Sequence, residues 1–300
     1  MNWSTMNHGQ PDRTLLRDPT WLPSAHARQA FLPEDPQEHA RRLIGTVTAL
    51  WPSGSSLEVP LGTTAALALL PLADAESPEL AHDVAVLEPA DLMTVLRQMW
   101  AHLWLSQPYL VERAHLLWRW LADPSQQTAD TVTELTHHLF RGGVLEFGAD
   151  PERYLATDLL GRLLQQMSNR GEKSGRGAFH TPDVVTDHMV EYFADDLPPG
   201  TVIGEAAAGS GAMWRAQARL LHDTGRNPTQ YRWVAAEIDP LTVAVLGANS
   251  LLWRLGSDVA IACADALAGD SGLAQAQLER ASATARRDAF IANPHSSDIA

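Results

Sequence analysis

The strongest constraint on the fold of this chain is an alternation, after residue 200, of short β-rich runs with helical segments. The β-rich runs are TVIGEA (201–206), YRWVAAE (231–237), VAIACA (259–264) and DAFIA (288–292). Strands that alternate with helices are typical of a parallel sheet with crossover helices. The sequence therefore predicts an α/β fold whose sheet ends after a fourth strand.

The part of the chain before residue 150 has a different pattern. Apolar residues in ADLMTVLRQMWAHLWL recur at three- and four-residue steps, at Leu92, Val95, Met99 and Leu103, which is the spacing of an amphipathic helix. Tryptophans in these helices are better explained by packing in a core than by stacking on a ligand, since aromatic side chains dominate core energetics.

Three regions follow from these patterns. Residues 1–40 contain five prolines that prevent a continuous helix, and we predict a loosely ordered arm there. Residues 41–150 form a predicted helical domain, and residues 151–300 form the domain that carries the sheet.

Charge limits what this chain can do alone. The net charge of −14 argues against unaided binding of nucleic acid, because Lys and Arg supply most non-specific affinity for phosphates. Arg170, Lys173 and Arg176 gather in the Gly-rich stretch 169–177, which is either a phosphate-facing loop or a solvated connector.

Cysteine and hydropathy bound the cellular setting. Cys263 is the only cysteine, so neither a disulfide framework nor a cysteine-based metal cluster is expected. No apolar run is long enough to span a bilayer, and the N-terminus does not have the order of a secretion signal. We expect a cytoplasmic protein without a membrane association.

Polar residues stand where each predicted strand ends. Gly209 and Gly211 follow the first strand, Glu237 ends the second, Asp265 ends the third, and Asn293 ends the fourth. In a parallel sheet these ends share one edge, where open α/β sheets bind their ligands. A glycine turn followed by an acid that can accept ribose hydroxyls predicts a nucleoside ligand. Asp265 alone is better explained as a helix cap.

These motifs, in this order, resemble those of S-adenosylmethionine-dependent adenine-N6 DNA methyltransferases, especially the methylation subunits of type I restriction-modification systems. The matching segments are GRGAFHTPDVVTDHMVEYF, VIGEAAAGSGAMW, VAAEIDPLTVAVLGANSLLWRLG, ACADAL and DAFIANPHS, within residues 151–300. The resemblance implies a Rossmann-like methyltransferase sheet, restriction-modification DNA methylation and DNA as the partner.

The resemblance also implies roles for individual residues. The methionine part of the cofactor would be held by residues on two segments, namely Phe179, Thr181, Glu205, Gly209 and Gly211. Glu237 would hold the ribose and Asp265 the adenine amine. The target amine of a flipped adenine would bond to Asn293 and the carbonyl of Pro294, which direct its lone pair at the methyl group. Neither role needs a metal.

Two departures from the family pattern bear on activity. The family's second proline and aromatic residue are replaced by His295 and Ser296, and serine cannot stack on a flipped base. His295 would stack instead if the loop shifts by one residue. The three strands that usually follow are missing, so the fourth strand would be an unpaired apolar edge. We therefore expect that edge to be covered by a partner chain, such as a specificity subunit, or by self-association, or else that the chain is a truncated remnant.

Two further patterns have ordinary explanations. The histidines show neither the spacing nor the co-ligands of a metal site. Arg215 and Arg219, one helical turn apart, are better explained as a solvated face than as a phosphate clamp.

Two functions of different class remain. The first is an adenine-N6 DNA methyltransferase, active alone or with a specificity subunit that supplies positive charge. The second is a catalytically weakened cofactor-binding or scaffold subunit with the same half-fold. The ordered motif series favours the first, and His295 with Ser296 favours the second.

Overall fold

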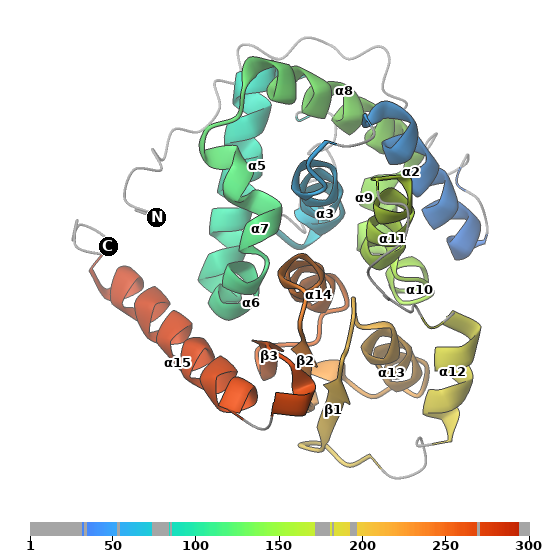
Figure 1. Cartoon of the computed structure of the whole chain (residues 1–300), viewed down its shortest axis with the longest axis vertical. Helices are drawn as coiled ribbons and strands as arrows, with labels where there is room; N and C mark the ends of the chain where they lie inside the picture. The colour runs from blue at the N-terminus through green and yellow to red at the C-terminus, as the bar shows by residue number, and fades with distance from the viewer. Residues whose placement is uncertain are drawn as a thin grey trace.

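The structure of the chain is a computed structural model. The structure describes residues 35–52, 55–73, 86–171, 183–192, 197–268 and 271–293, together with Leu32, Val84 and Thr181. In Figure 1 a group of helices fills the upper part of the molecule and a small sheet lies below it.

The first half of the chain is helical, as predicted. Its helices are α2 (Pro36–Leu50), α3 (Glu58–Ala73), α5 (Pro89–Ser106), α6 (Pro108–Arg113), α7 (His115–Trp118), η3 (Arg119–Ala122), α8 (Gln126–Gly142), α9 (Val144–Ala149), α10 (Pro151–Tyr154) and α11 (Leu159–Gly171). Trp100, Trp104 and Trp118 are buried in the core of these helices, which confirms that they pack rather than present a ligand surface. No helix of the described ranges is long and apolar enough to cross a membrane.

The predicted boundary of the N-terminal arm is wrong by several residues. Helix α2 already begins at Pro36, and the Asp35 side chain accepts a hydrogen bond from the backbone N–H of Gln37. Proline fits the first turn of a helix because the N–H it lacks would have no partner there. The rest of the predicted arm, apart from Leu32, lies outside the described residues.

The second half of the chain contains the predicted parallel sheet. Its elements are α12 (Asp183–Glu191), β1 (Val202–Ala206), α13 (Ala212–Asp223), η5 (Pro228–Gln230), β2 (Arg232–Glu237), α14 (Pro240–Leu252), β3 (Val259–Cys263), η6 (Ala266–Ala268) and α15 (Ser271–Ala292). The described strands pair in the order β1-β2-β3, and both pairs are parallel. Helix α14 begins as predicted, with Asp239 as its N-cap and Pro240 in the first turn.

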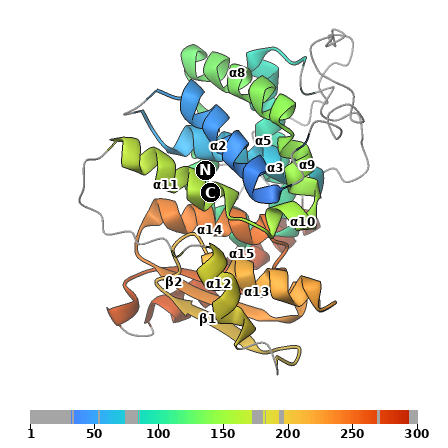
Figure 2. The ribbon, with the colours of Figure 1, turned by 90° about the vertical axis from the view of Figure 1, so that its right-hand side faces the viewer.

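Helices cover both faces of this sheet. Trp214 of α13 packs edge-to-face on Trp233 of β2, at 5.5 Å between ring centroids. Helix α14 lies on the same face and separates the sheet from the helices above it, as Figures 1 and 2 show. The opposite face carries Ala236, Ala260 and Ala262, which pack against Ala276 of α15. Small side chains on this face let α15 approach the strands closely.

The two edges of the sheet differ. The Tyr109 hydroxyl of α6 donates to the Ile261 carbonyl at 3.0 Å and accepts from the Ile261 N–H at 2.9 Å, so one side chain satisfies both backbone groups of a β3 edge residue. At the other edge, β1 pairs only with β2 among the described strands, and its residue Val202 is 54% exposed. The helical half thus closes one edge, and the β1 edge stays open among the described strands.

The predicted fourth strand is wrong. Residues 288–292 form the last turns of α15 and pair with no strand in the described part of the chain. The preceding residues are rich in the helix formers Ala, Gln, Leu and Arg, and no breaker separates them from Asp288. The Phe290 ring packs edge-to-face on Trp104 of α5, at 6.0 Å between centroids. A short apolar run cannot by itself distinguish strand from helix, and here helix packing decides.

Candidate functional site

Three of the four predicted strand-end features lie on one edge of the sheet. The register pairs Ala206 with Ala236 and Glu237 with Cys263, so the carboxyl ends of the three strands are level. The turn 207–211 follows β1 directly, Glu237 is the last residue of β2, and Asp265 stands two residues beyond β3. This edge is where open α/β sheets bind ligands.

The turn after β1 has an unusual backbone. Ala207, Gly209 and Gly211 have φ angles of 57°, 58° and 95°. Positive φ costs glycine little but strains alanine, by about 1 kcal/mol or more. A Cβ at Gly211 would lie 2.5 Å from a methyl carbon of Leu246, whereas one at Gly209 would meet no described atom within 4 Å. The turn is therefore packed at Gly211 and open at Gly209.

Glu237 joins the turn to the second strand. Its Oε2 accepts from the Gly209 N–H at 2.9 Å, and its Oε1 accepts from the N–H groups of Ile238 and Asp239 at 2.8 and 2.9 Å. Four lone-pair sites on a carboxylate leave capacity for a further donor. The acid is thus held in place by the backbone on both sides of the rim.

Asp265 caps the turn that follows it, as expected for this residue taken without the accompanying motifs. Its Oδ1 accepts from the Leu267 N–H at 2.9 Å, and the side chain is exposed. Leu267 and Ile238 are 95% and 66% exposed. Each follows one of the two rim acids by one or two residues, so apolar side chains flank both carboxylates.

Glu205 is the most unusual acid of the site. Its Oε2 is buried and has no hydrogen-bond partner among the residues that the structure describes. Burial raises the pKa of Glu205 from 4.5 to about 8. A buried carboxyl group without a partner is costly, and a cation that reaches it relieves that cost.

Two hollows adjoin the rim. A pocket of about 210 Å³ lies between the sheet and the start of α15, and its lining includes Glu205, Asp265 and Gly272. A larger pocket of about 510 Å³ lies on the other side of the turn and is lined by residues of α2, α11, α12 and the turn, including Thr181 and Ser210. The first pocket thus adjoins the strand ends at Ala206 and Asp265, and the second adjoins the turn at Ser210.

The structure places Asn293 away from this rim. The pocket beside Asp265 is lined by Gly272 and Leu273 at the start of α15, while Asn293 follows the other end of that helix. The 22 residues of α15 correspond to about 33 Å at 1.5 Å per residue. Predicted site residues outside the described part of the chain are Phe179, Pro294, His295 and Ser296. Of the basic stretch 169–177, residues 172–177 also lie outside it, and 169–171 end α11.

The prediction for Arg215 is wrong. The side chain is completely buried, and its guanidinium donates to the Leu155 carbonyl at 2.7 Å and to Asp187 at 2.6 Å. Asp183, at the start of α12, lies 3.6 Å from the same group and also bonds Arg162 at 2.5 Å. Arg219, by contrast, is 40% exposed, as predicted. Arg215 thus fixes α12, and with it the Thr181 segment, on α13.

Sequence reasoning missed two polar residues behind the turn. Asp158 and Asn249 are buried and joined by a hydrogen bond of 2.9 Å. A signal for each exists: Asp158 precedes the amphipathic run of α11, and Asn249 is an amide within the almost wholly apolar helix α14. Ile238 and Leu267 were missed because an isolated aliphatic residue after an acid has no distinct pattern.

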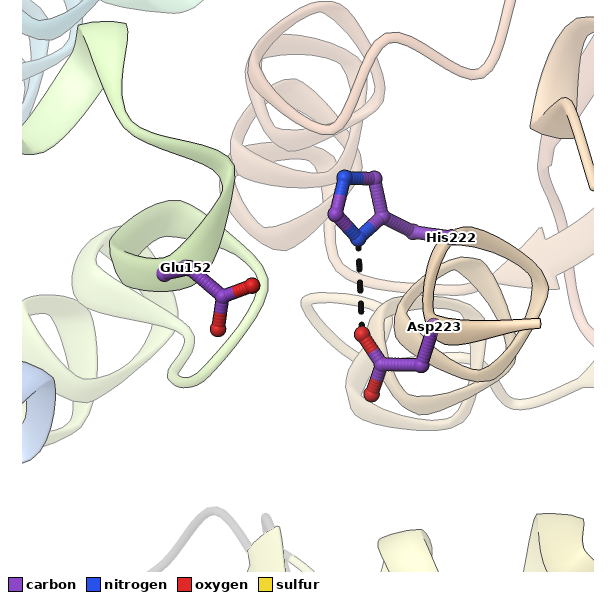
Figure 3. Close-up of side chains that lie close together, drawn as sticks. All are labelled: Glu152, His222 and Asp223. Atoms are coloured by element: carbon purple, nitrogen blue, oxygen red, sulfur yellow. Dashed lines mark hydrogen bonds and ion pairs between the residues drawn. The ribbon is translucent and has the colours of Figure 1, made fainter. Parts of the chain in front are cut away.

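One surface cluster has the residue types of a metal site. Glu152 of α10 and His222 and Asp223 of α13 point toward one another in Figure 3, with ligand atoms within 4.8 Å. All three are exposed, and they lie at the opposite end of α13 from the Gly-rich turn. Asp223 already contacts His222 at 3.4 Å and Arg219 at 3.6 Å. These ion-pair contacts account for the cluster, and we assign no metal to it.

Comparisons with known proteins bear on this rim. The chain is similar to the crystal structure of a type I restriction-modification system methyltransferase subunit from Streptococcus thermophilus, with 15% identity and a TM-score of 0.49. The match covers 79% of this chain and 60% of that one, so this chain spans less than two thirds of that subunit. No curated protein sequence matches the chain. The family model described as N-6 DNA Methylase matches residues 155–299, which include the Gly-rich turn and both rim acids. Residues 155–299 of this chain are thus similar to the N-6 DNA methylase family.

Proposed function

We propose that this chain is an S-adenosylmethionine-dependent methyltransferase of restriction-modification type that acts on N6 of adenine in DNA. The observation that carries the proposal is the meeting of the Gly209 turn with Glu237 and Asp265 on one edge of the sheet, within a domain of this family. When bound, S-adenosylmethionine supplies the methyl group.

The residues at the rim fit this cofactor. Glu205 offers a buried carboxyl oxygen without a partner, which suits the cationic methionine end. Gly209 leaves open space above the turn, so a ligand can approach the backbone closely. Thr181, Gly211 and, beyond the described residues, Phe179 would complete the hold on the methionine part.

The nucleoside end would lie along the second and third strands. Glu237 would accept from the ribose hydroxyls while it keeps its bonds to the backbone, and Asp265 would accept from the adenine amine. The exposed side chains of Ile238 and Leu267 would cover the two faces of the purine, because flat apolar rings bind well between aliphatic groups.

The target adenine would bond to Asn293 and the Pro294 carbonyl. This assignment depends on the sequence motif, since Asn293 follows the far end of α15 in this structure. Transfer would therefore require the end of α15 to rearrange toward the rim. The amide oxygen and the carbonyl would orient the amine, and no acid-base group is needed for that task.

A partner would complete the assembly. The acidic chain has few basic groups with which to hold DNA, so a specificity subunit with a positive surface would supply the phosphate contacts. The open β1 edge is a surface at which another chain can pair.

A second function is favoured by the position of Asn293. A chain that binds the cofactor while its Asn293 segment stays in α15 would be a cofactor-binding scaffold subunit without transfer activity. The two functions share the rim and differ only in methyl transfer.

Calorimetry with S-adenosylmethionine tests the shared part. We expect binding to the wild-type chain and a loss of at least about tenfold in affinity for Glu237→Ala, because bonds to a charged group contribute about 1.5–3 kcal/mol. Asp130→Ala, at an exposed acid of α8, is the matched control and should bind as the wild type does.

Transfer of a radiolabelled methyl group to adenine-containing DNA then separates the two functions. Formation of N6-methyladenine that is lost in Asn293→Ala supports the methyltransferase. Binding without transfer, also in the presence of the other subunits of its system, supports the scaffold. Absence of cofactor binding by the wild-type chain refutes both.

A further inference from the structure

A buried polar cluster lies directly behind the Gly-rich turn. It consists of Asp158, which precedes α11, Ser210 of the turn and Asn249 of α14, and we call it the clasp. Its three side chains are 4%, 3% and 0% exposed. Most buried polar groups in proteins are hydrogen-bonded, so the bonds of the clasp indicate what it holds. Among its side-chain atoms, Asn249 Oδ1 has no partner in the described part of the chain, and the bonds of Asn249 come from its Nδ2.

Asn249 is the centre of the clasp. Its Nδ2 donates to Asp158 Oδ1 and to the Ser210 carbonyl oxygen, both at 2.9 Å. One amide group therefore bonds the turn on one side and the helical half of the chain on the other. The partners are far apart in sequence, so these bonds fix tertiary rather than local structure.

The side chains of Asp158 and Ser210 complete the contact. The Ser210 hydroxyl bonds the Asp158 carboxylate, whose Oδ1 also accepts from the Gly161 N–H at 2.8 Å. A Cβ at Gly161 would lie 2.2 Å from Ser210 Oγ and 2.1 Å from Asp158 Oδ2. Glycine at 161 thus makes room for Ser210 to seat against the start of α11.

The turn needs such support. Ala207 holds a left-handed backbone that alanine disfavours, and the open side of Gly209 gives no packing. A strained turn persists only when its surroundings determine its shape. Two hydrogen bonds hold the turn in shape: the Gly209 N–H donates to Glu237, and Asn249 of the clasp donates to the Ser210 carbonyl.

We propose that Asp158 and Asn249 are positioning residues of the cofactor site, which hold the Gly209–Gly211 turn in its binding shape by anchoring it to α11 and α14. They act through Ser210 and do not contact the reacting atoms. The inference rests on the proposed function for its ligand, while its structural part concerns the turn alone. Cofactor affinity thereby depends on the docking of the helical half behind the turn.

The first test uses the full ligand-free chain and amide hydrogen exchange. Asp158→Ala and Asn249→Ala are compared with Val132→Ala, a buried residue of α8 remote from the turn whose truncation also lowers stability. We expect exchange at residues 207–213 to become at least tenfold faster in the two clasp variants and to stay near the wild-type rate in the control. Equal rates in clasp variants and control overturn the proposal.

The second test is calorimetry with S-adenosylhomocysteine on the same variants, with Asp158→Asn added. Asparagine keeps an acceptor oxygen for Gly161 and Asn249, and the Ser210 hydroxyl can rotate to accept from its amide. We expect a tenfold or greater loss of affinity for Asp158→Ala and recovery to within threefold for Asp158→Asn. Loss of melting temperature without loss of affinity, as in Val132→Ala, assigns the clasp a purely structural role and refutes the proposal.

The two tests also separate this proposal from the proposed function. If the wild-type chain binds neither S-adenosylmethionine nor S-adenosylhomocysteine, the proposed function and the cofactor role of the clasp both fail. The exchange rates then still decide whether the clasp shapes the turn.

Discussion

At the scale of single residues, the site combines acids that are satisfied with one that is not. Glu237 receives three backbone N–H bonds, whereas Glu205, one strand away, has a buried oxygen without any partner. Bonds to N–H groups stabilise a carboxylate, and burial without them destabilises it. The two acids of the rim therefore differ in how far their carboxyl groups still need a bonding partner.

Glu205 should make the stability of the protein depend on pH. Because burial raises its folded-state pKa from 4.5 to about 8, the folded chain keeps a proton that the unfolded chain releases, and the free energy of unfolding falls as pH rises through that window. Glu205→Gln should flatten this dependence and raise the free energy of unfolding at pH 8.5 by about 1–3 kcal/mol. Urea unfolding of the wild type and the variant at several pH values measures this pH dependence of the free energy of unfolding.

The same substitution, which should raise stability at high pH, should lower the affinity for S-adenosylmethionine. Under the proposed function, Glu205→Gln removes the carboxyl group that would give up its proton and pair with the cationic methionine end, so affinity for S-adenosylmethionine should fall at least about tenfold. Glu152→Gln, at an exposed carboxyl group of α10, should change neither quantity. A variant at Glu205 that binds as the wild type does would contradict the role given to this residue.

Tyr109 permits a second test at this scale. Tyr109→Phe keeps the ring but leaves both the N–H and the carbonyl of Ile261 without their partner, so we expect a loss of about 1–3 kcal/mol in the free energy of unfolding. Tyr231→Phe removes a single bond, to the Leu197 carbonyl, and should cost less. Chemical denaturation of both variants decides the order, and an equal or reversed order would contradict this account.

At the scale of elements, the sequence predicted those helices and strands that are determined by neighbouring residues, and it failed where contacts distant in sequence decide the structure. The strand-turn-helix segments after residue 200 follow from local signals, such as the Asp239 cap with Pro240 and the glycines of the turn. The end of α15 does not, because DAFIA suits either structure and its packing on Trp104 involves a helix far away in sequence. Contacts between distant elements likewise explain why the burial of Arg215 and the clasp were missed.

Helix α12 gives the prediction at this scale. Arg215 bonds Asp187 and the Leu155 carbonyl while completely buried, and removal of one partner from such a pair leaves an uncompensated charge. Arg215→Met should lower the free energy of unfolding by about 3–5 kcal/mol. Arg219 also lies on α13 but is 40% exposed, so Arg219→Met should lower the free energy of unfolding by no more than about 1 kcal/mol.

Thermal and chemical denaturation of the two methionine variants provide the measurement. Similar losses for Arg215→Met and Arg219→Met would show that burial of the first guanidinium contributes nothing to the attachment of α12. Limited proteolysis within α12 offers a second readout, since release of this helix from α13 should make its peptide bonds accessible in the Arg215 variant alone.

At the scale of the whole molecule, the net charge determines how well this chain can bind DNA without a partner. The sheet end of the protein carries the rim, and the net charge of −14 opposes approach to DNA. We expect the isolated chain to bind a labelled non-specific duplex more weakly than about 100 µM at physiological ionic strength, since non-specific binding depends on phosphate neutralisation. Fluorescence anisotropy measures this, and micromolar affinity would contradict the need for a basic partner.

The Tyr109 hydroxyl occupies the backbone groups of Ile261 on the outer side of β3, so within the described part of the sheet the edge free to pair with an additional strand is that of β1. A strand added there in the parallel sense would end immediately beside the Gly209 bend. Pairing of such a strand would therefore also form one side of the proposed cofactor site. Association with another chain and binding of the cofactor would then be coupled through the geometry of the sheet.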